Sequence, residues 1–286
     1  MKKIICILYS LLLVLPMWAV VTIHTIGDST MDAYKGKQTD RRGWAMYLGN
    51  YFNPDSVIVN DRGKSGASTR SFYERTDLWQ TVKEQFHSGD YLIIQFGHND
   101  EKCKGEDVLV ENARLRAEGV DTITDMRGTE PNTTYKMYLF KFINEARSYG
   151  VTPILMSSIC RAYFKDGKIN EEGQHKLPGK KELSSEEAAK VLRPKGTYDK
   201  DYMRCMREVA DDMCVPFLDM TAVSKELYER QGQEFCMEHY FNCGDKTHTG
   251  EEGARAIAKL AYQLIRDAER LEELQSWLLP EGEAAQ

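Results

Sequence analysis

The sequence predicts a single α/β domain, a three-layer α/β/α sandwich in which a five-stranded parallel sheet is covered by helices on both faces. Short apolar runs alternate five times with segments of helical periodicity. The runs are almost continuously apolar, as in parallel strands that are buried on both faces. The chain has 286 residues, of which 42% are hydrophobic, and no repeat or linker marks a second domain.

The expected strands are short, rich in β-branched residues, and bounded by turn-forming residues. The first ends abruptly at Gly27, and the third, Tyr-Leu-Ile-Ile-Gln-Phe, ends at Gly97. Such alternation with helices favours right-handed crossovers between neighbouring parallel strands. The five strands are expected at residues 20–26, 57–60, 91–96, 152–159 and 215–218.

The expected helices carry apolar residues at a spacing of three and four, and stop signals follow several of them. Pro54, Gly89 and Gly150 are such stops. Two long polar stretches, 101–132 and 165–197, are expected to be surface excursions. Helices are expected at residues 43–52, 72–86, 133–149, 198–213, 221–231 and 251–277, and residues 232–250 are expected to be loop.

The first nineteen residues have the layout of a secretory signal peptide. A basic start, Lys2 and Lys3, precedes a short apolar run, and the segment ends at the small residue Ala19. We expect cleavage near Ala19 and a periplasmic or secreted protein; an uncleaved membrane anchor is the alternative. The domain would then span residues 20–279, followed by a disordered tail at 280–286.

The charge balance limits the partners of the chain. The formal charge is −6, and losing Lys2 and Lys3 makes it −8. This argues against nucleic acid or an anionic membrane as the main partner, although a local basic groove can still bind an acidic polysaccharide. The oligomeric state is open.

Six cysteines follow the leader, and none has the spacing of a zinc site. We therefore expect no metal. Export permits disulfides, and Cys236 with Cys243 is the pair most worth testing because the two flank a loop before a candidate catalytic stretch.

Four loops at the expected carboxyl edge of the sheet carry the candidate chemistry, and ligands bind at that edge in open α/β sheets. They are Gly27-Asp28-Ser29-Thr30, Gly66-Ala67-Ser68-Thr69, Gly97-His98-Asn99-Asp100 and Asp245-Lys246-Thr247-His248.

Together these loops supply what acyl transfer needs. Ser29 is the candidate nucleophile and His248 the candidate base. Asp245, three residues earlier, can orient the imidazole. The backbone amides of Ser29 and Gly66 and the side-chain amide of Asn99 are the candidate oxyanion donors, with Gly63 as the alternative to Gly66.

Each loop also has a simpler interpretation. Ser29 can be a helix cap or a turn residue, and Asp-x-x-His at a helix start is often a cap beside a surface histidine. Gly-His-Asn-Asp is a natural turn. The glycine-rich loop lacks the Gly-Lys-Ser/Thr ending of a phosphate-binding loop. The occurrence of all four loops in one order at one edge favours the catalytic interpretation.

The order and the motifs resemble those of the SGNH (GDSL-like) hydrolases, whose four signature residues match Ser29, Gly66, Asn99 and His248. Further similarity is to the rhamnogalacturonan acetylesterase branch. It lies in Gln95–Lys102, Thr152–Met156, Arg161, Val215–Asp219 and Asp245–Thr249, with Gly253-Ala254 after them.

The resemblance implies a flavodoxin-like fold and removal of acetyl groups from plant cell-wall polysaccharide, rhamnogalacturonan above all, without a cofactor. One departure is Ala67, because members of the branch usually carry Arg directly after the oxyanion glycine; Arg70 remains nearby. The alternatives are a lipase, thioesterase or acetylxylan esterase on the same scaffold, and a catalytically silent carbohydrate-binding protein. The polar loops disfavour acyl-chain substrates.

Overall fold

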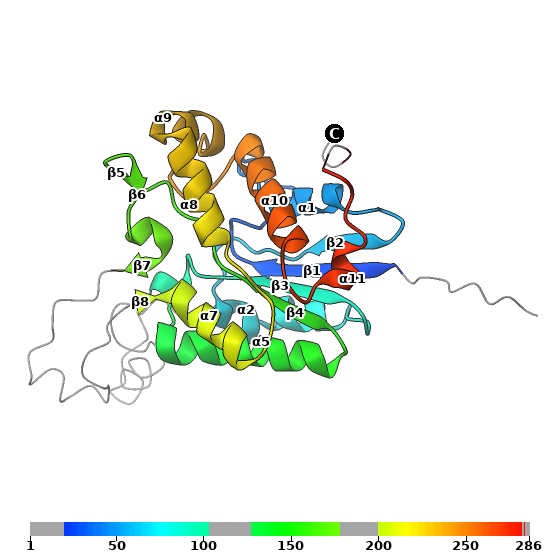
Figure 1. Ribbon diagram of the computed structural model, residues 1–286. Coiled ribbons are helices and arrows are strands. Elements are labelled where there is room, and N and C mark those ends of the chain that lie inside the picture. Colours follow the sequence, from blue (N-terminus) through cyan, green and yellow to red (C-terminus); the bar gives the residue numbers. More distant parts are fainter. Residues whose placement is uncertain (1–19, 103–126, 178–199, 282, 284–286) are drawn as a thin grey trace, which may run out of the picture.

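A computed structural model describes residues 20–102, 127–177, 200–281 and 283 of the chain. Its centre is a five-stranded sheet in which every neighbouring pair is parallel, in the order β2-β1-β3-β4-β9 (Figure 1). This confirms the predicted sheet. The strands are β1 (Val21–Gly27), β2 (Val57–Asp61), β3 (Tyr91–Gln95), β4 (Thr152–Met156) and β9 (Phe217–Leu218).

The register of the sheet sets the place of the candidate site. Gly27 at the end of β1 pairs with Gln95 at the end of β3, so the turns after these two strands leave the sheet side by side. All five residues of β3 are buried, as its continuous apolar sequence predicts for a strand covered on both faces.

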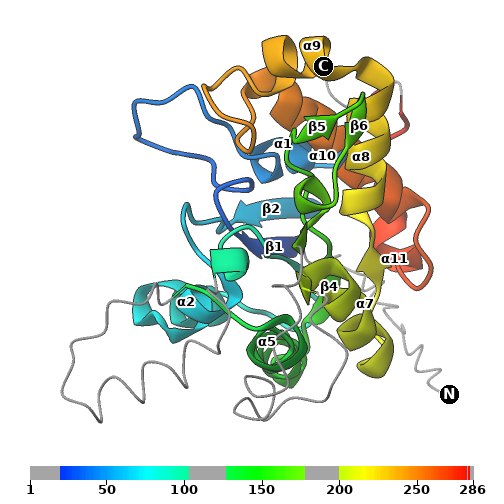
Figure 2. The ribbon, with the colours of Figure 1, turned by 90° about the vertical axis from the view of Figure 1, so that its left-hand side faces the viewer.

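Helices cover both faces of the sheet, which confirms the predicted three-layer sandwich (Figures 1 and 2). One core contains Trp44, Ile257 and Tyr228, and the other contains Phe72, Phe142 and Met206. The first face is covered by α1 (Ala45–Leu48), α8 (Met220–Gln231) and α10 (Glu251–Arg266), and the second by α2 (Thr69–Glu74), α5 (Lys136–Ser148) and α7 (Tyr202–Asp212).

Three predicted elements differ most from the structure, and the strand expected at 152–159 ends at Met156. The helix expected at 72–86 starts earlier, because Ser68 caps α2 in a capping box with Ser71, and it is interrupted by the extended Arg75. The closing helix ends at Arg266, and Arg270 has a left-handed backbone before α11 (Glu272–Gln275). The interval 232–250 is partly helical rather than loop: it contains α9 (Gln233–Phe235) and η6 (Cys236–Tyr240).

The remaining elements are short helical turns and two small antiparallel pairs of strands outside the central sheet. They are η1 (Gly49–Tyr51), η2 (Thr76–Gln80), α3 (Thr81–Lys83), η3 (Asp100–Lys102), η4 (Pro131–Tyr135), η5 (Glu172–Gln174), β5 (Phe164–Lys165) with β6 (Lys168–Ile169), and β7 (Lys176–Leu177) with β8 (Lys200–Asp201).

The predicted leader lies outside the described residues, as do most of the polar stretches 101–132 and 165–197 and part of the predicted tail. Among the helices that the structure describes, none has the length and apolar character needed to span a bilayer. The cysteines in the described ranges are free thiols, and this includes Cys236 and Cys243, so no disulfide joins the pair that the sequence singled out for testing.

Candidate active site

The candidate nucleophile lies on a tight turn at the carboxyl end of β1. The carboxylate of Asp28 shapes this turn by accepting the N–H and the hydroxyl of Thr30, each at 2.9 Å. Gly27 has no room for a side chain, because a Cβ atom would lie 2.8 Å from the backbone oxygen of Gln95 and 2.1 Å from the sulfur of Met31. Ser29 is thereby held at the edge of the sheet with 7% of its surface exposed.

The acid–base pair comes from the turn that precedes α10, 219 residues further along the chain. The hydroxyl of Ser29 lies 2.9 Å from Nε2 of His248, and Nδ1 of His248 donates to Oδ2 of Asp245 at 2.7 Å. The other carboxylate oxygen accepts the backbone N–H groups of Thr247 and His248, both at 2.8 Å. Burial alone would raise the pKa of Asp245, but these hydrogen bonds outweigh it and lower the pKa. Nε2 of the imidazole is therefore free to accept a proton from Ser29.

The candidate oxyanion donors also lie at this edge. The structure records no acceptor for the backbone N–H groups of Ser29 and Gly66 within its described part. Gly66 has a φ of +82°, a conformation that favours glycine. Asn99 donates one side-chain N–H to the carbonyl of Ala67 at 2.8 Å. Gly63, by contrast, donates its N–H to Asp61 at 2.8 Å, so the geometry favours Gly66 over Gly63.

Asp100 joins the two loops that carry Gly66 and Asn99. Its carboxylate accepts the hydroxyl of Thr69 at 2.6 Å and the hydroxyl of Thr129 at 2.7 Å, and the N–H of Thr69 at 3.2 Å. Burial raises the pKa of Asp100 to about 7 despite these donors. The relative position of the two candidate oxyanion loops therefore depends on a buried carboxyl.

A second His–Asp pair joins the nucleophile turn to the turn after β3. Nδ1 of His98 donates to Oδ2 of Asp28 at 2.9 Å, and both side chains are buried. Burial lowers the pKa of His98 to about 4, and Nε2 of this ring has no partner in the described part of the chain. Sequence spacing had no way to reveal this pair, because 70 residues separate its members.

Three arginines lie near the candidate site loops in the sequence or in space, and each has different partners. Arg41 donates Nη2 to Oδ2 of Asp245 at 2.9 Å, a contact that the sequence did not predict. Arg161 binds Glu101 at 2.6 Å and the carbonyl of His98 at 3.2 Å, and so supports the loop that carries Asn99. Arg70 is buried and pairs with Glu74, and no hydrogen bond joins it to the candidate site residues in the described ranges.

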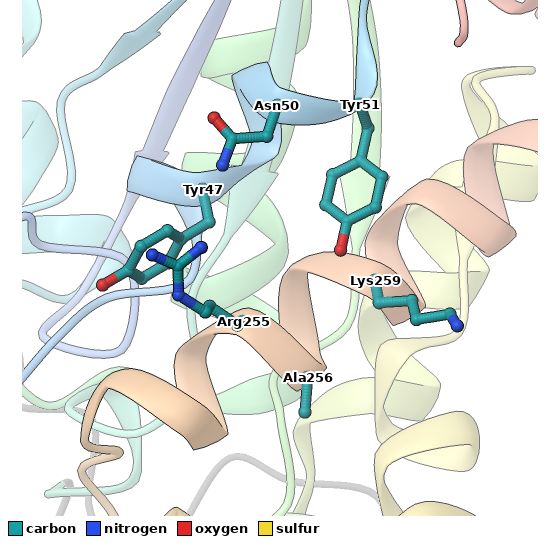
Figure 3. A pocket seen from close by; sticks show the side chains of 6 residues that line it. All are labelled: Tyr47, Asn50, Tyr51, Arg255, Ala256 and Lys259. Carbon is teal, nitrogen blue, oxygen red and sulfur yellow. The ribbon is translucent and has the colours of Figure 1, made fainter. Parts of the chain in front are cut away.

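A hollow of about 230 Å³ lies elsewhere, between α1, η1 and α10 (Figure 3). Three of its lining side chains are already engaged: Arg255 lies 4.4 Å from the ring centre of Tyr47 and pairs with Glu251, and Tyr51 stacks on Tyr262. None of the predicted site residues lines it. Within the described residues, no cluster of potential metal ligands is present.

Comparison with known proteins agrees with the fold and the motifs. The model of the GDSL-like lipase/acylhydrolase family matches residues 25–256. The chain belongs to this family and is a serine ester hydrolase.

Within the family, the chain belongs to the rhamnogalacturonan acetylesterase-like branch. It is 30% identical to the rhamnogalacturonan acetylesterase RhgT of Bacillus subtilis (strain 168), over 86% of this chain and 90% of that protein. It is 27% identical to the probable rhamnogalacturonan acetylesterase YesY of the same organism, over 86% and 92%.

A solved structure shares the fold. The crystal structure of Bacillus subtilis protein YXIM superposes with a TM-score of 0.60 at 20% identity, covering 86% of this chain. This chain spans 56% of that protein's length.

Proposed function

We propose that this chain is a carbohydrate esterase that removes O-acetyl groups from plant cell-wall polysaccharide, with rhamnogalacturonan as the polymer. The observation that carries the proposal is the continuous hydrogen-bonded series from Ser29 through His248 to Asp245, with distances of 2.9 and 2.7 Å. The acetylesterase names of two relatives that align along most of their length support the choice of ester.

In the proposed reaction, the hydroxyl oxygen of Ser29 attacks the acetyl carbonyl while His248 takes the hydroxyl proton. Asp245 holds the imidazole in the tautomer that leaves Nε2 free, and stabilises the imidazolium that forms. The N–H groups of Ser29 and Gly66 and the amide of Asn99 bind the developing oxyanion.

The tetrahedral intermediate then collapses, and its bond to the sugar oxygen breaks as His248 returns the proton to that oxygen. Water attacks the resulting acetyl-serine with His248 again as the base, and acetate leaves. Each step uses only side chains and backbone groups of this chain and water. We also propose that residues 1–19 direct export and are removed near Ala19, which would bring the enzyme to a periplasmic or extracellular polymer.

Acetate release from acetylated rhamnogalacturonan and from acetylated xylan, by the wild type beside Ser29→Ala, tests this proposal. Release from the pectic polymer, lost in Ser29→Ala, is the expected result. Release from xylan alone would keep the chemistry and overturn the polymer. Glycan binding without acetate release from either polymer would instead favour a silent binding protein.

A further inference from the structure

One segment of the chain contacts all three parts of the candidate site. We refer to residues 32–43, which lead from the nucleophile turn toward α1, as the brace segment. We propose that the brace segment holds the nucleophile turn and the acid–base turn in register, with Tyr34 and Arg41 as positioning residues for the reaction. The proposal rests on the proposed function of Ser29, His248 and Asp245.

The two catalytic turns need such a connection. Between the turn at 27–31 and the turn at 245–250, the only hydrogen bond recorded in the described part of the chain is the one from Ser29 to His248. A single contact between two side chains does not by itself fix the distance between the turns. A misplacement of about 1 Å at reacting groups costs about a hundredfold in rate, so this distance matters.

At its first end, the brace segment holds the nucleophile turn. The phenol of Tyr34 donates to the carbonyl oxygen of Ser29 at 2.9 Å. Burial raises the pKa of Tyr34 to about 12, so the phenol keeps its proton as a donor. Tyr34 has a φ of 52°, which L residues rarely adopt. Its N–H is held by Asp32 at 2.8 Å, and the ammonium of Lys37 lies over its ring.

The same segment contacts the oxyanion loop. Oδ2 of Asp32 accepts the backbone N–H of Ser65 at 3.0 Å and the ammonium of Lys37 at 2.7 Å. Ser65 directly precedes Gly66, so the carboxylate of Asp32 links Tyr34 to the loop that presents the second candidate oxyanion donor.

At its other end, the brace segment holds the acid–base turn through three contacts. Arg42 donates its backbone N–H to the carbonyl of Thr249 at 2.9 Å, and the hydroxyl of Thr249 donates back to the carbonyl of Arg42 at 2.9 Å. Arg41 adds the charged contact, because its Nη2 donates to Oδ2 of Asp245 at 2.9 Å. With this donor, the carboxylate of Asp245 has four donors and its orientation is fixed.

The charge and the geometry of Arg41 predict opposite effects on rate. A cation on the oxygen that faces His248 weakens the stabilisation that Asp245 gives to the imidazolium, so by charge alone its removal would raise the rate. By geometry, its removal takes away one of the four donors of the carboxylate and the charged contact between the brace segment and the acid–base turn, and so lowers the rate. The brace proposal requires the second effect to be larger.

The test compares Arg41→Met, Arg41→Lys and Tyr34→Phe with the wild type, using p-nitrophenyl acetate as a small neutral ester. Arg75→Met is the matched control, since Arg75 pairs with Asp77 at an exposed position on the helical layer of α2. We expect kcat to fall about tenfold to a hundredfold in Arg41→Met, and less in Arg41→Lys and Tyr34→Phe, with KM and the melting temperature nearly unchanged.

Two further readouts separate positioning from a general loss of structure. Millimolar guanidinium is expected to restore part of the rate of Arg41→Ala and to leave the wild type unaffected. The double variant Tyr34→Phe/Arg41→Met is expected to lose less than the product of the single losses, because both act on one segment.

Wild-type or higher kcat in Arg41→Met would overturn the brace proposal, and so would an equal loss in Arg75→Met. The Ser29→Ala variant keeps this outcome apart from the proposed function. If Ser29→Ala is inactive while Arg41→Met matches the wild type, only the brace proposal fails. If Ser29→Ala keeps its activity, the proposed function itself fails.

Discussion

Two His–Asp pairs contact the turn that carries Ser29, and they differ in what Nε2 of each histidine can reach. Asp28 and Ser29 are adjacent in the sequence, but Asp28 binds His98 while Ser29 binds His248, both at 2.9 Å. His98 and Asp28 are shut off from solvent, and Nε2 of His98 meets no partner in the described part of the chain. His248 retains 17% of its side-chain exposure and Asp245 retains 32%.

This difference in access separates a base from a structural residue. Proton transfer needs a nucleophile within reach of the imidazole and a path for substrate and water. Only the pair of His248 with Asp245 has both. The pair of His98 with Asp28 instead fixes the backbone of the turn, because Asp28 also binds the N–H of Thr30. In the proposed reaction, the same two residue types thus serve catalysis at one site and the shape of the turn at the other.

The largest effect on rate is expected for the partly exposed pair of His248 with Asp245. His248→Ala should lower kcat for p-nitrophenyl acetate by about 10⁴-fold or more, the scale seen when a triad base is removed. The melting temperature should change little, because the side chain is partly exposed. A loss smaller than about tenfold would mean that His248 is not the base, and the proposed difference between the two His–Asp pairs would fail.

Substitution of Asn99, the residue that follows the buried His98, should have an intermediate effect on rate. Asn99→Ala removes one candidate oxyanion donor, which typically costs about a hundredfold or more in kcat. It also removes the hydrogen bond to Ala67, so a circular dichroism melt must accompany the kinetics. An unchanged rate would remove Asn99 from the oxyanion hole.

Replacing the buried histidine should cost stability more than chemistry. His98→Ala leaves the buried carboxylate of Asp28 without the neutral N–H donor of His98, and loss of a hydrogen bond to a charged group costs about 1.5–3 kcal/mol of unfolding free energy. Urea titration measures this loss. The activity of the folded fraction should fall far less than in His248→Ala; an equal fall would mean that His98 is itself needed for the chemistry.

The smallest expected effect is on the pH dependence of stability. Burial depresses the pKa of His98 from 6.5 to about 4, so its stabilising contribution is complete above pH 6.5 and is lost as the pH falls through about 4. Burial alone would raise the pKa of Asp28, but its contacts with His98 and Thr30 outweigh burial and lower the pKa. The stabilising contribution of Asp28 is therefore also lost as the pH falls, at a lower pH than that of His98. Between pH 7 and 4, His98→Asn should lose less unfolding free energy than the wild type. Equal slopes for the two proteins would contradict the neutral buried state of His98.

The two pairs also show what the sequence predicts and where it fails. Asp245 and His248 lie three residues apart, so one turn joins them and their spacing alone suggested a pair. Gly27 and the apolar run before it located the nucleophile turn, and β3 followed from its unbroken apolar sequence.

Contacts between distant parts of the chain were not readable in this way. His98 lies 70 residues from Asp28, and Arg41 lies 204 residues from Asp245, so no local pattern connects them. The break at Arg75 and the early end of α10 depend on backbone conformations at single residues, which helical periodicity does not record. Local spacing predicted the strands and the turn with Asp245 and His248, whereas the tertiary supports of the site required the structure.

The most direct test of the central claim is to label the wild type with a fluorophosphonate, which reacts with activated serines, and to locate the modified peptide by mass spectrometry. The account predicts one label, on Ser29, formed at least about a hundredfold more slowly in His248→Ala and at a nearly normal rate in folded His98→Asn. Labelling of another serine, or equal slowing by the two histidine substitutions, would contradict the account.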